Sequence, residues 1–370
     1  MNKKVKNKQL EGIAEATLGL LFGQDRANAG KYAYLNGGGV KFDAFIRNNE
    51  NYLTFWKESE ILQEQGSNIA QEVNDAEHVI IVGQGSAFSD KEWHVVKQLE
   101  NIKKITFIDL AEKFNAAALK EINAHKPEMK STNVEATAIT GRYQDIDKKT
   151  IAHWNKDYDK TLIMCVGSLI TNIEKIAKDS YPENETHEEL REIFRLVGNN
   201  GYAVIGYNAI EKQSTLQRSY ANDLLGEFMI NALHYMIMNT PDLRIEDING
   251  NPLDKNDRET INDLFEYVME DAKFDTKTRN YAHEVKAKKS FKVFCSLDDP
   301  DQDQKCKDIE AGAVFTMMNS YQSSTSIINT LVKNISHAAK AYDVGEILAR
   351  GKDNINIHSF KITPKAQQPS

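Results

Sequence analysis

Three residues in the first third of the chain, Gly83, Gly85 and Asp109, have the types and the spacing to hold a small polar ligand. The two glycines follow a short apolar run at 79–82, and a second apolar run at 105–108 ends directly at Asp109. A buried strand that stops at glycines lets the backbone approach a ligand closely. A carboxylate at the exit of the next strand is placed to accept hydrogen bonds from ribose hydroxyls. The pattern therefore predicts a site for a nucleoside-containing molecule.

Phe88 distinguishes between the possible nucleoside cofactors. The dinucleotide fingerprint has a third small residue three positions after the second glycine, and Phe88 stands there. Close packing of the helix on the strand is therefore not expected at this turn. S-adenosylmethionine (SAM) has a ribose for Asp109 but no pyrophosphate, so it does not require the third glycine. The turn favours SAM over NAD, although two glycines also occur in tight strand–helix turns that bind nothing.

Polar residues also follow a later apolar run, at 160–166. Gly167 and Ser168 are predicted to turn the chain there, and Asn172 would then lie near the ligand cleft. Ser168 or Thr171 is equally suited to cap the next helix, and the two interpretations are compatible.

The elements that would position these residues follow from the apolar periodicity. Residues 1–66 are predicted to be mainly helical, and residues 67–206 alternate between strand and helix. Strands are expected at 78–83, 104–109, 133–139, 160–166 and 202–207, with helices between them, including one at 183–197. Five strands joined by four crossovers predict an α/β fold with a doubly wound parallel sheet, whose ligands bind at the carboxyl ends of the strands.

The alternation stops after residue 207. Residues 214–240 have a long helical pattern, and the charged stretch 241–285 contains no clear strand. More sheet is expected at 291–295, 315–327 and 355–362, with a helix at 328–342 and a disordered tail from Pro364. We therefore expect an inserted α+β substrate-binding module made of residues 1–66 and 207–312. The nucleoside-binding domain would comprise residues 67–206 and 313–370.

Composition excludes several classes of protein. The net charge of −8 argues against nucleic acid or an anionic membrane as the main partner. No apolar core of a signal peptide follows the basic start, and no apolar run approaches the roughly 18 residues of a membrane span. The three cysteines, Cys165, Cys295 and Cys306, have neither disulfide nor zinc-site spacing. We expect a cytoplasmic enzyme that acts on a small molecule, and the sequence does not predict its oligomeric state.

Short segments along the chain lie in the order of the motifs of one enzyme family. Residues 51–55, 83–86, 107–111 and 165–172 resemble Tyr-Tyr-Pro-Thr-Arg, a glycine turn, Pro-Ile-Asp-Ile-Ser and Phe-Leu-Gly-Ser-Thr-Ile-Gly-Asn of that family. Residues 219–222 and 228–231 resemble its Ala-Tyr-Asp-Asp and Phe-Asn-x-Asn, and His283 stands where the family has a histidine. The family is the SAM-dependent histidine N-methyltransferases of the ergothioneine pathway and their relatives. The resemblance runs from about residue 50 to the C-terminus.

The resemblance implies a Rossmann-like methyltransferase that uses SAM and releases S-adenosylhomocysteine (SAH). It implies that Asn172 and Tyr220 act as catalytic residues that hold the amino and carboxylate end of an amino-acid substrate. These side chains suit that role, although core packing is an alternative for Tyr220. The resemblance further implies a substrate pocket lined by Tyr52, Met318 and Ser320, and cofactor contacts from Gly83, Gln84, Gly85, Ser86, Asp109, Leu110, Arg142, Tyr143, Gly167 and Ser168.

Acidic positions of the family are replaced in this chain. Its late Thr-Glu-x-Ser aligns with residues 317–320, so Ser320 is kept but Met318 replaces the glutamate. A thioether accepts hydrogen bonds weakly and favours an apolar or aromatic group, so histidine itself is not expected as the substrate. Arg142 replaces the acid that contacts the adenine amine, which then needs another acceptor such as Asp145 or the backbone. Asn208 replaces a further aspartate.

The leading hypothesis is metal-free transfer of a methyl group from SAM to a nitrogen of a small amino acid or derivative. The replaced acids leave open a catalytically inactive, methyltransferase-like binding or regulatory protein. A third possibility is an enzyme that uses another nucleoside cofactor in the same cleft. The run Glu188, Glu189 and Glu192 is predicted to be a solvated helix face, not a metal site.

Overall fold

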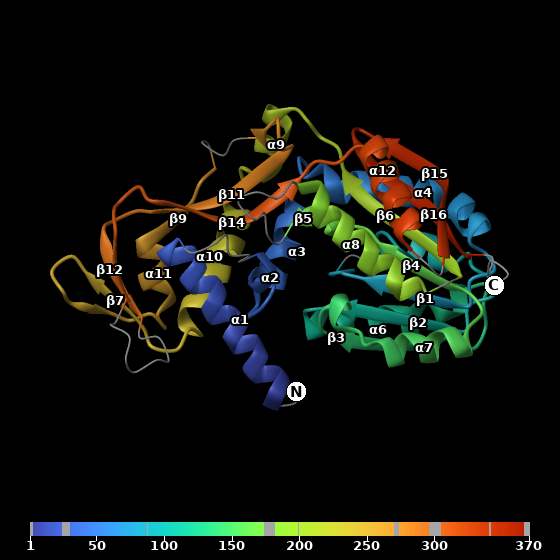
Figure 1. Cartoon of the computed structure of the whole chain (residues 1–370), viewed down its shortest axis with the longest axis horizontal. Coiled ribbons are helices and arrows are strands. Elements are labelled where there is room, and N and C mark those ends of the chain that lie inside the picture. The colour runs from blue at the N-terminus through green and yellow to red at the C-terminus, as the bar shows by residue number, and fades with distance from the viewer. Residues whose placement is uncertain are drawn as a thin grey trace. The chain divides into compact units, whose positions relative to one another are not determined.

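The computed structural model describes residues 3–23, 30–86, 88–173, 182–198, 200–269, 274–295, 305–339 and 342–365. The chain forms two compact units (Figure 1). One, which we call the large-sheet unit, consists of Glu50–Asn172, Pro182–Glu211 and Tyr321–Ser370. The other, the small-sheet unit, consists of Met1–Asn49, Ile173–Tyr181 and Lys212–Ser320. Most of the tail for which disorder is predicted, 366–370, lies outside the described residues.

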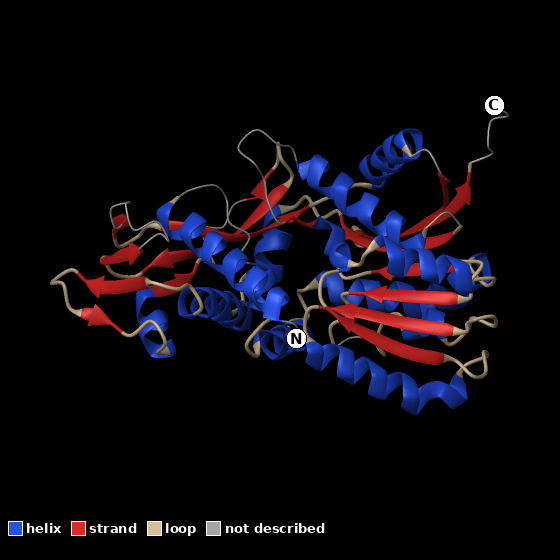
Figure 2. Ribbon diagram, turned by 60° about the horizontal axis from the view of Figure 1, so that its bottom comes forward, coloured by secondary structure: helices blue, strands red, loops and turns tan. Residues whose placement is uncertain are grey.

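The large-sheet unit is built on a seven-stranded sheet with the order β15-β16-β6-β4-β1-β2-β3. Its strands are β1 (His78–Val82), β2 (Lys104–Asp109), β3 (Glu135–Thr140), β4 (Thr161–Cys165), β6 (Gly201–Asn208), β15 (Tyr342–Lys352) and β16 (Ile355–Pro364). Strands β1, β2, β3, β4 and β6 are parallel (Figure 2). Strand β16 runs antiparallel to β6, and β15 antiparallel to β16. The predicted doubly wound, Rossmann-like sheet is confirmed.

Helices cover both faces of this sheet. Val79 and Ile81 of β1 pack into one apolar core, and Ile80 and Val82 into the other. The first core includes α4 (Leu53–Glu72), α5 (Trp93–Val96) and α6 (Glu112–His125), and the second includes α7 (Lys148–Asp157), α8 (Pro182–Val197) and α12 (Thr325–Ala338). The 3-10 turns are η1 (Lys126–Glu128), η2 (Tyr143–Asp145) and η3 (Leu169–Thr171). Because both faces are covered, the central strands are continuous apolar runs, which makes them recognisable in the sequence.

The strand order reverses beside β1. Strands β2 and β3 lie on one side of it, and β4 and β6 on the other. In open α/β sheets, ligands bind outside the carboxyl ends of the strands at such a reversal. Gly83 directly follows β1, and Gly167 comes two residues after β4, so both glycines lie at this edge.

Two predictions near the C-terminus are corrected. The helix expected at 328–342 is α12, which begins at Thr325 because the Ser324 hydroxyl accepts a hydrogen bond from the Ile327 N–H (3.3 Å). Strand β15 is not apparent in the sequence. It lies at the end of the strand order, and most of its residues are exposed or half-buried, so it lacks an apolar run.

The small-sheet unit contains six helices among its described residues: α1 (Lys3–Phe22), α2 (Gly30–Ala33), α3 (Gly38–Asn48), α9 (Gln213–Tyr220), α10 (Asp223–Met238) and α11 (Arg258–Leu264). One sheet has the order β13 (Lys305–Ile309), β12 (Phe291–Cys295), β7 (Leu243–Asp247) and β8 (Pro252–Leu253). The other has the order β10 (Phe274–Asp275), β11 (Asn280–Ala287), β14 (Val314–Tyr321) and β5 (Asn172–Ile173), and β9 (Phe265–Tyr267) also pairs with β11.

The expectations for this part of the chain are partly wrong. The charged stretch 241–285 contains strands, and β11 shows why they are hard to recognise: its buried positions include a tyrosine and a histidine, so its apolar alternation is weak. The helical pattern 214–240 contains two helices, because Asn222 caps α10 by accepting a hydrogen bond from the Leu224 N–H (2.9 Å). The sheet expected at 315–327 ends with β14 at Tyr321.

Within the described part of the chain, we find no helix that combines the length and the apolar character needed to cross a membrane.

Candidate functional site

Asp109 connects three loops at the carboxyl edge of the large sheet. Its Oδ2 accepts a hydrogen bond from the Gly85 N–H (3.2 Å), and its Oδ1 accepts one from the Ala111 N–H (2.8 Å). The N–H of Gly141, which follows β3, donates to the Asp109 carbonyl oxygen (3.0 Å). The glycine turn and the carboxylate that the sequence singles out are therefore parts of one hydrogen-bonded assembly.

The Asp109 carboxylate has capacity left for a ligand. Asp109 is 9% exposed, and burial raises its pKa to about 6, while the N–H donors of Ala111 and Gly85 act in the opposite direction. A carboxylate has about four acceptor positions, of which these two donors use two. A Cβ added at Gly85 or Gly141 would meet no described atom within 4 Å, so these glycines border open space. The remaining acceptor positions and this space fit the two hydroxyls of a ribose, which donate hydrogen bonds.

The turn after β1 depends on its glycines. Gly83 and Gly85 have φ angles of +65° and +56°, a left-handed conformation that glycine adopts without strain. A Cβ at Gly83 would also lie 3.3 Å from the side chain of Leu169. The Gln84 side chain is buried and donates to Asn115 Oδ1 (3.1 Å), so it supports the turn from within the protein. Three other residues expected around the cofactor are half-buried: Ser86, Leu110 and Arg142.

A buried ion pair holds the loop after β4. Glu58 on α4 accepts a hydrogen bond from the Gly167 N–H (2.7 Å) and pairs with Lys91 (3.3 Å). Gly167 and Ser168 have φ angles of +89° and +55°, and Ser168 is buried. A Cβ on Gly206 would collide with Glu58 Oε1, so a glycine on β6 makes room for the carboxylate.

The sequence analysis misses both members of this pair, although a signal exists for Glu58. It lies on the buried stripe of α4, between Phe55 and the pair Ile61 and Leu62, at helical spacing. A carboxylate on such a stripe is costly unless it has a partner. Lys91 lies in an irregular segment and has no comparable signal.

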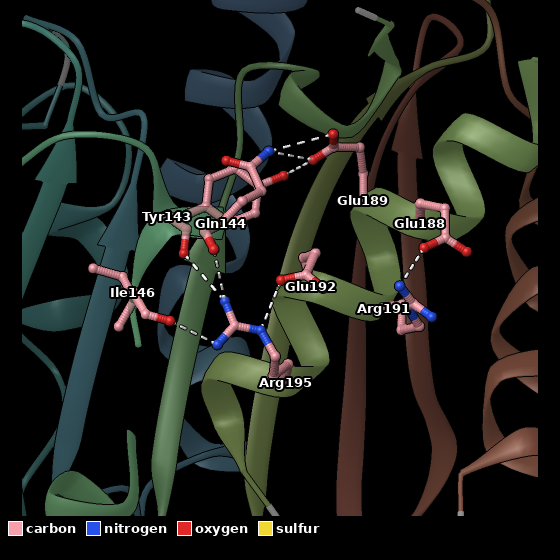
Figure 3. Close-up of polar contacts among 8 residues, drawn as sticks. All are labelled: Tyr143, Gln144, Ile146, Glu188, Glu189, Arg191, Glu192 and Arg195. Atoms are coloured by element: carbon pink, nitrogen blue, oxygen red, sulfur yellow. Dashed lines mark hydrogen bonds and ion pairs between the residues drawn. The ribbon is translucent and has the colours of Figure 1, made fainter. Parts of the chain in front are cut away.

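The turn η2 after β3 is bound to helix α8, as Figure 3 shows. The buried Tyr143 hydrogen-bonds the Glu189 carboxylate through its hydroxyl, and the Gln144 amide donates to both Glu189 oxygens (3.0 and 3.3 Å). Arg195 donates to the carbonyl oxygens of Ile146 (2.8 Å), Gln144 (3.3 Å) and Tyr143 (3.4 Å). Two residues of α8 therefore hold η2, one through side chains and the other through the backbone.

The three glutamates of this run have different surroundings: Glu192 is half-buried and pairs with Arg195 (2.7 Å). Glu188 is exposed and pairs with Arg191 (2.5 Å), as expected for a solvated face. Glu189 is half-buried, and burial raises its pKa to about 7, while the nearby Arg142 guanidinium acts in the opposite direction. The prediction of a solvated face is therefore wrong for Glu189.

In the small-sheet unit, Tyr220 and Ser320 meet in a buried cluster around His283. The His283 ring contacts the Ser320 hydroxyl through Nε2 (2.9 Å) and the Tyr267 hydroxyl through Nδ1 (3.0 Å). Ser320 also hydrogen-bonds the Tyr220 hydroxyl. The ring centroid of Tyr220 lies 4.6 Å from that of His283 and 4.9 Å from that of Tyr281. Burial lowers the pKa of His283 to about 3, so its imidazole is neutral at pH 7.

The remaining predicted substrate residues are placed as follows. Met318 is half-buried on β14, two residues before Ser320. Tyr52 is buried directly before α4. Asn172 begins β5, and its side chain lies outside the described part of the chain.

A model of a protein family described as "Histidine-specific methyltransferase, SAM-dependent" matches residues 14–334 of this chain. Curated proteins give no match.

Several solved methyltransferase structures are distantly similar. An O-methyltransferase family protein from Burkholderia thailandensis has 12% identity and a TM-score of 0.37, covering 82% of this chain and 57% of its own. The CurJ carbon methyltransferase has 8% identity and a TM-score of 0.41, with coverage of 98% and 72%. The plantazolicin methyltransferase BpumL, solved with SAH, has 13% identity and a TM-score of 0.35, with coverage of 98% and 99%. The chain thus spans little more than half of the Burkholderia protein.

Proposed function

Since the chain belongs to the family of SAM-dependent, histidine-specific methyltransferases, we propose that it methylates a nitrogen atom of a small amino acid or amino-acid derivative other than histidine. SAM supplies a methyl group activated by its sulfonium sulfur. The protein contributes alignment of the acceptor nitrogen and exclusion of water.

In this proposal the large-sheet unit binds the cofactor. Asp109 holds the ribose, because its carboxylate is fixed by the N–H groups of Gly85 and Ala111 and retains acceptor positions. Gly83 and Gly85 keep the turn open through their left-handed conformations. These residues fit the cofactor that the family uses.

The surroundings of Ser320 are the observation that supports a substrate other than histidine. Its hydroxyl already contacts His283 Nε2 (2.9 Å) and Tyr220, and Met318 lies two residues before it on β14. A substrate imidazole has an N–H that requires a good acceptor, and a thioether is a weak one. A side chain that is apolar or aromatic suits Met318 better. Tyr220 and Asn172 would hold the amino and carboxylate groups of that substrate.

A labelling screen tests the proposal. The protein is incubated with SAM that carries a deuterated methyl group and with a panel of amino acids and derivatives, and products are identified by tandem mass spectrometry. We expect a label on the nitrogen of an acceptor with an apolar or aromatic side chain, and none on histidine. A labelled oxygen, carbon or histidine would contradict the proposal. Binding of SAH without any labelled product would favour a binding or regulatory protein.

A further inference from the structure

Helix α8 directs one carboxylate, Glu189, against the turn that follows β3 (Figure 3). Three hydrogen bonds fix it: one from the Tyr143 hydroxyl and two from the Gln144 amide (3.0 and 3.3 Å). A carboxylate has about four acceptor positions, so Glu189 can accept one more hydrogen bond. Its neighbours fix its orientation and leave it able to bind a donor.

The turn that Glu189 contacts begins two residues after a glycine that is hydrogen-bonded to Asp109. Gly141 donates to the carbonyl oxygen of Asp109 (3.0 Å), and Tyr143 follows two residues later. Two residues span at most about 7 Å, so η2 begins within the length of one nucleoside from Asp109. A nucleoside whose ribose contacts Asp109 can therefore extend its base over η2, toward the residues that Glu189 contacts.

Thr186 is a second polar residue of α8 that bears on this position. Thr186 is fully buried, and its hydroxyl has no hydrogen-bond partner among the described residues. It lies three residues before Glu189, a spacing that puts both side chains on one face of the helix. Buried hydroxyls are normally hydrogen-bonded, so an unpartnered one on this face points to a polar ligand.

We propose that Glu189 accepts a hydrogen bond from the exocyclic amine of the adenine of SAM, and so selects adenine over bases that carry a carbonyl there. A guanidinium has donors only, so Arg142, the residue between Gly141 and Tyr143, cannot take this role. Asp145, the acid of η2 itself, is exposed, whereas Glu189 of α8 is half-buried. The inference rests on the cofactor of the family and not on the proposed nitrogen acceptor.

Two cofactor products that differ only at the base test this role. SAH carries the amine, whereas S-inosylhomocysteine carries a carbonyl oxygen, which a carboxylate repels. By titration calorimetry, the unaltered protein should bind SAH at least about tenfold more tightly than the inosyl compound. In Glu189→Gln the ratio should fall to about one, because a carboxamide can donate to the carbonyl. Glu188→Gln, one residue away and exposed, should keep the original ratio.

The ratio of two affinities in one preparation is insensitive to partial loss of folded protein. Gln144→Ala, which removes two of the bonds that fix Glu189, provides a second variant and should lower the ratio without reversing it. An unchanged ratio in Glu189→Gln would overturn the inference. Failure of the unaltered protein to bind SAH would overturn its premise, the cofactor. A failed search for a methyl acceptor leaves this binding test unaffected.

Discussion

The two candidate sites hold their polar groups in opposite ways. At the edge of the large sheet, Asp109 is surrounded by backbone N–H groups from Gly85, Ala111 and Gly141. In the small-sheet unit, Ser320 contacts the side chains of His283 and Tyr220. Backbone contacts persist when neighbouring side chains change, provided that the glycines and the strand geometry remain. A side-chain contact is lost when either of its residues is replaced. The site at Asp109 can therefore keep its ligand through sequence change, whereas the site at Ser320 can acquire a new one.

The Glu58–Lys91 ion pair is a side-chain contact at the edge of the large sheet, where the donors to Asp109 are backbone N–H groups. Breaking this pair should have the largest effect. Lys91→Met leaves a fully buried carboxylate without its cation. We expect the free energy of unfolding to fall by about 3–5 kcal/mol. Urea unfolding followed by circular dichroism measures the loss.

The exposed pair of Lys130 with Glu100 provides the control. Lys130→Met should change stability by less than about 1 kcal/mol. Adding Glu58→Gln to Lys91→Met should recover part of the loss, because the unpaired charge is removed. Equal effects of Lys91→Met and Lys130→Met would show that the loop after β4 does not depend on this side-chain pair.

The next effect tests the backbone-held site directly. Asp109→Ala removes the acceptor for the Gly85 and Ala111 N–H groups and for the ribose. Charged hydrogen bonds contribute about 1.5–3 kcal/mol, so we expect SAH to bind about 100-fold more weakly in titration calorimetry. Asp145→Ala, on the exposed side of η2, should bind SAH normally. Binding of SAH to Asp109→Ala with undiminished affinity would remove Asp109 from the cofactor site.

The same contrast explains what could be predicted from the sequence. Gly83, Gly85 and Asp109 are recognisable because backbone geometry requires glycine and because the parallel strands are apolar on both faces. Glu189 and Lys91 are not recognisable, because their contacts are with residues distant in sequence: Glu189 meets η2 from α8, and Lys91 meets Glu58 on α4. Their roles depend on tertiary packing that no local pattern contains.

Strands of the small-sheet unit were harder to predict for a related reason. Strand β11 buries Tyr281 and His283 at alternate positions, and its half-buried positions include the charged residues Glu284 and Lys286. Such a sequence has the period of a strand but little apolar character. The residues that weaken the pattern are the ones that form the cluster around Ser320.

A pH experiment compares the buried histidines of the two units. Burial lowers the pKa of His78 on β1 and of His283 on β11 to about 3, from an ordinary 6.5. Between these pH values the unfolded chain binds protons that the folded chain does not, so stability falls as the pH falls. Each histidine contributes up to about 1.4 kcal/mol per pH unit, and nothing above about pH 7.

His283→Gln should therefore reduce the slope of the unfolding free energy against pH, between pH 6 and pH 4.5, by up to about 1.4 kcal/mol per pH unit. Urea unfolding at several pH values measures this slope. His78→Gln, in the large-sheet unit, should reduce the slope by a similar amount, because burial lowers the pKa of His78 to the same value. An unchanged slope in His283→Gln would mean that His283 becomes charged in the folded protein, and the cluster around Ser320 could not then be a neutral one.

The smallest expected effect separates the two sites functionally. Tyr220→Phe removes one hydroxyl from the cluster and leaves the ring packing against His283 and Tyr281 in place. With the acceptor identified in the labelling screen, we expect kcat/KM to fall about tenfold, since one hydrogen bond is lost. The affinity for SAH should not change, because Tyr220 belongs to the small-sheet unit. Tyr235→Phe, a half-buried tyrosine on α10, should alter neither quantity. A parallel loss of SAH affinity in Tyr220→Phe would mean that the side-chain cluster also supports the cofactor, and the division into a preserved and a variable site would no longer hold.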